Sequence, residues 1–160
     1  MNKKTIIVTG GFGVIGLALS KNLLNQGHNV VLADNKTNQA KLFKDKLSNL
    51  LVIKTNLNKE NEIRKTIRLS LKKFNQIDTL VHCAYPKTKD WGKTLKNLRQ
   101  ESLKKNLNNQ LGSTIILSKI IINQFLKQKF GNLILLSSIM GLNNPKFETY
   151  KGTNMSSPIE

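Results

Sequence analysis

The chain has 160 residues, the length of one domain with a single core. Its hydrophobic share of 39% excludes a disordered composition. No apolar run approaches the roughly 18–20 residues that cross a bilayer, so we expect no membrane partner. The single cysteine, Cys83, excludes an intrachain disulfide and suits a reducing, cytoplasmic location.

The net charge of +17 raises the question of a nucleic-acid partner. A nucleic-acid binder would gather its basic residues into one stripe or arm, often with arginines and interleaved aromatics. Here all but three of the 26 basic residues are lysines, spread from Lys3 to Lys151, and asparagine and isoleucine are abundant beside them. All three residue types have A/T-rich codons, which indicates nucleotide bias acting on solvated faces. We therefore predict no specific nucleic-acid partner, only loose attraction to polyanions.

The first third of the chain predicts two strand–helix units. Thr5–Thr9 is a β-branched apolar run bounded by glycine, which is typical of a buried parallel strand. Apolar residues then follow from Val14 at helical spacing, and Gly27 ends this helix. Asn29–Ala33 is the second predicted strand, and Lys36–Asn49 predicts an amphipathic helix.

The middle of the chain repeats the alternation. Leu50–Lys54 is the third predicted strand, and Asn58 is expected to cap the next helix with its side chain, followed by the early carboxylate of Glu60. Asp78–His82 is the fourth strand, and a polar loop follows it to about Asn97. The helix between these strands points one apolar stripe inward: Ile63, Ile67, Leu71 and Phe74.

A long helix is predicted from Glu101 to Phe130, with Gly131 in its stop signal. Its middle is apolar nearly all round, which indicates burial against the sheet and against a partner subunit, and hence a homo-oligomer through residues 101–130. Leu133–Ser137 is the fifth predicted strand, and no further strand or helix is readable after Gly141.

Alternating strands and helices with short connections predict a doubly wound parallel sheet, the Rossmann fold. Ligands of such sheets bind at the carboxyl ends of the strands, where the strand order reverses. The candidate site residues lie at these predicted ends: Thr9-Gly10, Asp34, Asn56, His82-Cys83-Ala84 and Ser137-Ser138.

A glycine loop follows the first strand and opens the first helix, with the spacing Gly10-x-x-Gly13-x-x-Gly16. Glycines allow a sharp turn and let backbone N–H groups approach a pyrophosphate, and the helix N-terminus adds partial positive charge. The last glycine allows close packing of helix and strand. We predict that Gly10, Gly13, Ile15 and Gly16 bind a dinucleotide cofactor.

Asp34 ends the second strand, 18 residues after Gly16. A carboxylate at this place can accept hydrogen bonds from a ribose diol and would repel a 2′-phosphate, which favours NAD over NADP. The alternative is a turn aspartate in Asp-Asn-Lys, and the neighbouring Lys36 keeps NADP open.

Four segments in this order resemble the short-chain dehydrogenase/reductase family, and together they extend over nearly the whole chain. The glycine loop is similar to the family's cofactor loop. The second segment resembles Asp-x-Leu-Val-Asn-Asn-Ala-Gly, with His82, Cys83 and Tyr85 replacing the two asparagines and the glycine. The four segments are Thr9–Gly16, Asp78–Tyr85, Asn109–Gly112 and Asn132–Gly141.

The resemblance implies roles for residues outside the glycine loop. Ser138 would be the catalytic serine that orients the oxygen of a small-molecule substrate, and Asn109 would help to hold a water for proton relay. Asn56 and Leu57 stand where the family has an Asp-Val pair at the adenine, and Ala84 would also contact the cofactor. His82 is expected to be a neutral, hydrogen-bonded side chain rather than a metal ligand.

The family's chemistry requires a tyrosine with a lysine four residues later, because the lysine lowers the pKa of the phenol. The residue four positions after Tyr150 is Asn154, which is uncharged, rather than the required lysine. The loop after the fourth strand resembles the same loop in a bacterial branch of the family that is linked to surface-sugar and flagellin-glycan biosynthesis. In that branch Pro-x-Glu precedes the catalytic tyrosine. This chain ends in Pro158-Ile159-Glu160. We therefore expect one truncated domain, residues 1–160, without the last strands and helices of the fold.

Together these features predict an NAD(H)-dependent oxidoreductase that acts on a carbinol or carbonyl, of a sugar-like substrate. The glycine spacing leaves open a sugar-nucleotide epimerase or dehydratase. The missing tyrosine leaves open a nucleotide-binding fragment without activity. Cys83 is interpreted as a small buried hydrophobic residue near the cofactor rather than a nucleophile.

Overall fold

The computed structural model describes residues 2–43, 48–91, 95–142 and 147–152. Five parallel strands form one sheet in the order β3-β2-β1-β4-β5. The chain moves outward from β1 to β3, then returns past β1 to form β4 and β5, so the predicted doubly wound Rossmann order is confirmed. The strands are β1 (Thr5–Thr9), β2 (Asn29–Asp34), β3 (Leu50–Lys54), β4 (Thr79–His82) and β5 (Asn132–Leu135).

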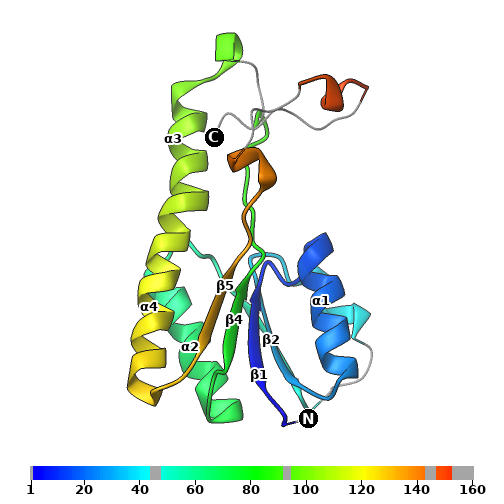
Figure 1. The fold of residues 1–160 in the computed structure, drawn as a ribbon, viewed down its shortest axis with the longest axis vertical. Helices are drawn as coiled ribbons and strands as arrows, with labels where there is room; N and C mark the ends of the chain where they lie inside the picture. The colour runs from blue at the N-terminus through cyan, green and yellow to red at the C-terminus, as the bar shows by residue number, and fades with distance from the viewer. Residues whose placement is uncertain (1, 44–47, 92–94, 143–146, 153–160) are drawn as a thin grey trace.

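Helices cover both faces of the sheet (Figure 1). Helix α1 (Val14–Asn25) packs on one face, and α2 (Glu60–Phe74) and α4 (Ser113–Gln128) pack on the other. The alternation of side chains along β1 divides the core between the faces: Val8 belongs to the cluster under α1, and Ile7 to the cluster under α2 and α4. None of the described helices combines the length and the apolar character that crossing a membrane requires.

The predicted long helix is present, but one turn of it is widened. Helix α3 (Gln100–Leu107) continues through a π-helical turn, Asn108–Gly112, into α4. The hydroxyls of Ser113 and Thr114 donate to the carbonyls of Asn109 and Gln110, which satisfies carbonyl groups in the widened turn. Helix α3 thereby extends beyond the carboxyl ends of the strands (Figure 1).

The predicted amphipathic helix over Lys36–Asn49 is wrong in its described part. The structure has a 3-10 turn, Asn38–Leu42, and residues 44–47 lie outside the described residues. In its described part Ala40 and Phe43 pack against the core whereas Leu42 is 53% exposed, so the apolar contact there extends over about one turn. Its asparagines and threonine favour turns over helix interiors, and this local preference decides the conformation.

The predicted side-chain cap of α2 is also wrong. The N-cap residue is Lys59, which makes no side-chain capping bond. The Asn58 amide instead donates to Oδ1 of Asn109 on the long helix at 2.8 Å. The early carboxylates of the helix are present as Glu60 and Glu62. A tertiary hydrogen bond thus replaces the local one that the sequence pattern favoured.

The last described residues differ from the prediction in two ways. Strand β5 ends at Leu135 rather than Ser137, and two 3-10 turns follow where no helix was readable, Ile139–Gly141 and Phe147–Tyr150. Leu133 packs against the core, whereas Ile134 on the opposite face of the sheet is 41% exposed, so that face of β5 is uncovered.

Candidate functional site

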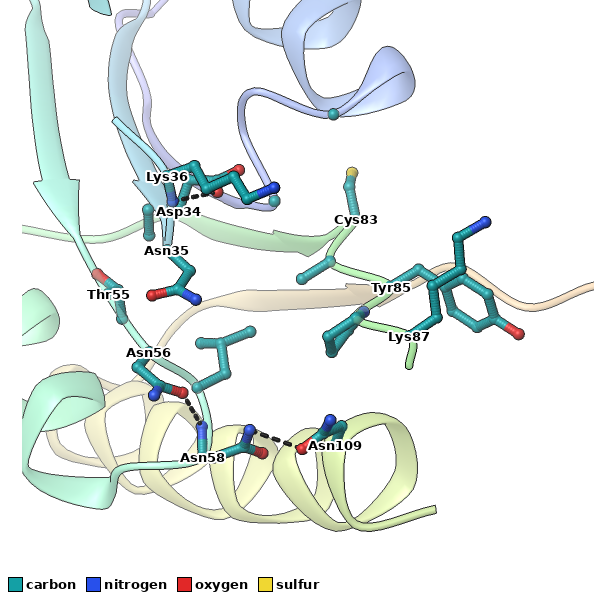
Figure 2. Close-up of a pocket in the computed structure, with 16 residues that line it drawn as sticks. Asp34, Asn35, Lys36, Thr55, Asn56, Asn58, Cys83, Tyr85, Lys87 and Asn109 are labelled. Carbon is teal, nitrogen blue, oxygen red and sulfur yellow. Dashed lines mark hydrogen bonds between the residues drawn. The ribbon is translucent and has the colours of Figure 1, made fainter. Parts of the chain in front are cut away.

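The carboxyl ends of β1 to β4 open onto a cavity of about 490 Å³, a size typical of small-molecule sites (Figure 2). The cavity lies at the switch point between β1 and β4, as predicted for a doubly wound sheet. Seven of the ten predicted site residues line it: Gly10, Gly13, Asp34, Asn56, Leu57, Ala84 and Asn109.

The glycine loop forms one wall of the cavity. Gly10 has a φ of +64°, and a Cβ there would lie 2.6 Å from Cα of Ala84, so the turn requires glycine on two grounds. The Gly10 N–H donates to the carbonyl of Ala33 at 2.8 Å, and its carbonyl accepts the N–H of Gly13 at 2.9 Å. Gly13 is the N-cap of α1 and supplies no side chain to its first turn. The positive end of the helix dipole is therefore open to an anion.

Asp34 stands across from the glycine loop at the end of β2. Its carboxylate accepts the backbone N–H of Phe12 at 3.1 Å and that of Lys36 at 2.9 Å. The first bond links the aspartate to the glycine loop, and the second closes a turn within its own segment. Each carboxylate oxygen accepts one of these bonds, which fixes the orientation of the group and leaves further acceptor capacity toward the cavity.

The end of β3 is held by asparagines. Asn56 accepts the N–H of Asn58 at its side-chain oxygen, and its own N–H donates to Glu62 at 2.7 Å. This backbone bond, with the nearby Lys59 ammonium, holds the pKa of Glu62 below its usual value although desolvation opposes the shift. Asn58 then joins this segment to Asn109 in the π-turn, so the ends of β3 and of α3 form one wall (Figure 2).

His82 ends β4 and is 6% exposed. Its Nδ1 lies 2.7 Å from the Thr9 hydroxyl of β1, and its Nε2 lies 2.9 Å from the Thr114 hydroxyl of α4. Thr114 donates its proton to the Gln110 carbonyl at 2.6 Å. Nε2 therefore donates to Thr114, and the neutral ring accepts from Thr9 at Nδ1. Desolvation lowers the pKa of His82, consistent with the neutral side chain that we predicted.

Cys83 and Ala84 continue from β4 into the cavity wall. The Cys83 N–H donates to the carbonyl of Thr9 at 3.0 Å, which continues the pairing of β4 with β1 by one residue. The thiol is half-buried, and burial raises the pKa of Cys83. A thiol with a raised pKa carries little thiolate near neutral pH, which argues against a nucleophilic role.

Three predicted residues do not line the cavity. Ile15 is 61% exposed in the first turn of α1, and Gly16 is buried beneath the loop against the Gly10 backbone. Ser138 is exposed beyond the end of β5, where its carbonyl accepts the N–H of Gly141. Its role as a catalytic residue stays a prediction.

The sequence reasoning missed several residues that shape the site. Thr114 positions His82 together with Thr9, which the sequence had placed at a strand end, and Asn58 positions Asn109. Thr114 and Asn58 are ordinary polar residues whose partners lie far along the chain. Of these residues, only Asn58 had a signal in the sequence that could have identified it as a site residue, namely its position shortly after the end of a predicted strand. Among the described histidine, cysteine, aspartate and glutamate residues, no three gather as a metal site.

Comparisons with known proteins place this architecture in one family. The family model for short chain dehydrogenases matches residues 4–153. The post-translational flagellin modification protein A of Campylobacter coli is 36% identical over 166 residues, covering all of this chain and 65% of that relative. A diacetyl reductase of Staphylococcus epidermidis is 31% identical over 145 residues, covering 86% of this chain and 54% of that enzyme.

Solved structures share the fold. A short chain dehydrogenase from Leptospira borgpetersenii with bound NAD+ superposes with a TM-score of 0.82 at 22% identity, over 99% of this chain and 59% of that one. ElxO with NADP bound gives a TM-score of 0.79 at 24% identity, over 90% of this chain and 59% of that one. This chain thus spans less than two thirds of the length of these relatives.

Proposed function

We propose that this chain, which belongs to the short chain dehydrogenase family, binds NAD(H) and forms the cofactor-binding part of an oxidoreductase. The observation that carries the proposal is one cavity lined by both the glycine loop and the Asp34 carboxylate. The bound NAD+ and NADP of two structural neighbours support a nicotinamide dinucleotide as the ligand.

The chain's own residues fit such a cofactor. The pyrophosphate would lie at Gly10 and Gly13, where the backbone is bare and the first turn of α1 has no side-chain cap. Asp34 would accept the hydroxyls of the adenosine ribose, and Asn56 with Leu57 would border the adenine. A bound nicotinamide would supply hydride transfer to or from a carbinol or carbonyl carbon.

We favour NAD over NADP because Asp34 would repel a 2′-phosphate. Its two backbone hydrogen bonds fix the carboxylate in place, so it would not rotate away without losing them. Lys36 also lines the cavity and is the residue that would favour NADP. Calorimetric titration of the chain with NADH and NADPH tests the choice. We expect NADH to bind at least about tenfold more tightly, with the preference reduced in Asp34→Ala, and tighter binding of NADPH would contradict the assignment.

We propose a sugar-like carbinol or carbonyl compound as the substrate. The resemblance to a branch linked to surface-sugar biosynthesis supports this class, and a flagellin modification protein is among the relatives, whereas the diacetyl reductase favours a small diketone. In the proposed reaction Ser138 orients the substrate oxygen and Asn109 supports proton relay. Oxidation of NADH, followed with nucleotide sugars and with diacetyl in parallel, separates the two classes, and turnover of a nucleotide sugar without net NADH consumption would favour the epimerase alternative.

We also propose that the long helix joins two copies of the chain. Leu111, Ile115, Ile122 and Leu126 recur at helical spacing and are 44–70% exposed, whereas Leu117 and Ile121 of the same helix are buried. An exposed apolar stripe of this length is typical of a subunit interface. Light scattering after gel filtration should give a dimer that Ile115→Lys converts to monomer, with Lys127→Gln, outside the stripe, as a surface control. A monomeric parent chain would contradict the proposal.

A further inference from the structure

The segment that leaves β4, here called the rim segment (Tyr85–Trp91), is attached to the long helix by polar side chains. Gln110 donates to the carbonyl of Pro86 at 3.2 Å. Asn106 accepts the N–H of Thr88 at 2.9 Å and donates to its hydroxyl at 3.1 Å, and Ser102 donates to Asp90 at 2.6 Å. The segment therefore runs antiparallel to the helix along one stripe of its surface.

The spacing of these bonds explains why they form together. The helix residues are four apart, a rise of about 6 Å, and their partners are two apart in extended chain, about 6.6 Å. Asn106 at the centre is fully buried, so its bonds to Thr88 are shielded from water. The attachment therefore holds the backbone of the rim segment at a defined height above the sheet.

Two-residue alternation in the rim segment sets which side chains face outward. The three residues bonded to the helix are half-buried, whereas Tyr85, Lys87 and Lys89 between them are exposed. Tyr85 and Lys87 also line the cavity, but Lys89 does not. Figure 2 places Tyr85 and Lys87 at the end of the cavity away from Asp34 and Asn56.

Lys87 lies against an aromatic ring at this rim. Its Nζ lies 4.7 Å from the centroid of the Trp91 ring, and the same ring meets Tyr85 edge-on at 5.8 Å. The described carboxylates form no ion pair with this ammonium. A positive charge oriented by an aromatic face and left accessible beside a cavity attracts an anion.

We propose that Lys87 binds an anionic group, a carboxylate or a phosphate, of the substrate at the rim of the cavity. The inference rests on the proposed function. In that proposal the opposite end of the cavity binds the adenosine of the cofactor, and the glycine loop binds its pyrophosphate. The substrate is accordingly a carbonyl or carbinol compound with a negative charge set apart from the reacting carbon. The cofactor's own phosphates are the other source of such an anion, and the experiment separates them.

Trp91 is the only tryptophan of the chain and reports on this site directly. Its fluorescence is followed while the full chain, saturated with NAD+, is titrated with glucose 6-phosphate, with glucuronate and with uncharged glucose. We expect the two anions to bind and glucose to leave the signal unchanged. Lys87→Gln should weaken anion binding by about tenfold or more, Lys87→Arg should retain most of it, and the matched control Lys89→Gln should bind as the parent chain does.

The affinity for NADH is measured on the same variants by calorimetry. We expect Lys87→Gln to bind NADH as tightly as the parent chain. A loss of NADH affinity with unchanged anion binding would assign Lys87 to the cofactor phosphates and overturn the proposal, as would equal binding of glucose and glucose 6-phosphate. Failure of the parent chain to bind NADH would instead refute the proposed function, while titration of the anions without cofactor would still test Lys87.

Discussion

Gly16 offers a strict test of how the first helix is joined to the glycine loop. A Cβ at this position would lie 2.2 Å from the carbonyl oxygen of Gly10 and 3.0 Å from Cα of Gly11. Both are backbone atoms, so no side-chain rotation can relieve the contact. Gly10 is itself fixed by hydrogen bonds to Ala33 and Gly13. In Gly16→Ala the loop and α1 must therefore separate by about 1 Å to restore van der Waals distance.

The size of the effect follows from two opposing terms. Overpacking of this kind lowers the free energy of unfolding by about 1–3 kcal/mol, and alanine in place of glycine within a helix raises it by up to about 1 kcal/mol. The free energy of unfolding should fall by about 1–2 kcal/mol. A displacement of about 1 Å also removes the N–H groups of the loop from hydrogen-bonding distance of a pyrophosphate, so the Kd for NADH should rise about tenfold or more.

Urea denaturation followed by circular dichroism and calorimetric titration with NADH measure the two effects. Gly141→Ala is the matched control, because a Cβ there meets open space. Gly11→Ala should be intermediate, since its Cβ would contact Cδ2 of Leu32, a side-chain atom that can move. If Gly16→Ala unfolds and binds NADH as the parent chain does, close packing of loop and helix does not set the geometry of the site.

Two titratable residues give further predictions. The folded pKa of His82 is depressed below its unfolded value of about 6.5, so the unfolded state binds more protons and stability should fall as the pH drops below that value, by up to about 1.4 kcal/mol per pH unit. His82→Leu should lose this component of the slope in urea melts at pH 7.5 and pH 5.5, and an unchanged slope would show that the ring titrates normally. Because burial raises the pKa of Cys83, iodoacetamide should alkylate it more slowly than free cysteine at pH 7.5, and saturating NADH should slow the reaction further. Alkylation at the rate of free cysteine would contradict this expectation.

Much of the fold could be predicted because it depends on local patterns. The β-branched apolar runs that end at Thr9 and Lys54 are the observed strands, and Gly27 follows α1 with a φ of +81°, as its position predicted. The helix prediction for Lys36–Asn49 was wrong because the amphipathic spacing shows how many apolar residues a segment has. It does not show how much core surface is available for them to pack against. Of the apolar residues in the described part of this segment, Ala40 and Phe43 pack against the core and Leu42 is exposed.

The site could be predicted in its outline but not in its connections. Parallel strands bring their carboxyl ends together, so Gly10, Asp34 and Asn56 were expected to meet. Hydrogen bonds between residues distant in sequence carry no such signature. Asn58 is the clearest case, since a helix cap and a bond to Asn109 use the same amide and the sequence favoured the local partner.

The π-turn and the first turn of α4 form three hydrogen bonds with the ends of β3 and β4, and this convergence accounts for the place of the π-turn in the helix. Asn109 is bonded to the segment after β3, the Gln110 side chain to the segment after β4, and Thr114 to His82 of β4 itself. An unbroken α-helix would rotate these residues onto different sides, because one extra residue per turn changes their angular spacing. The widened turn directs all three toward the sheet, so the position of Asn109 depends on how the helix fits the strand ends as well as on the sheet.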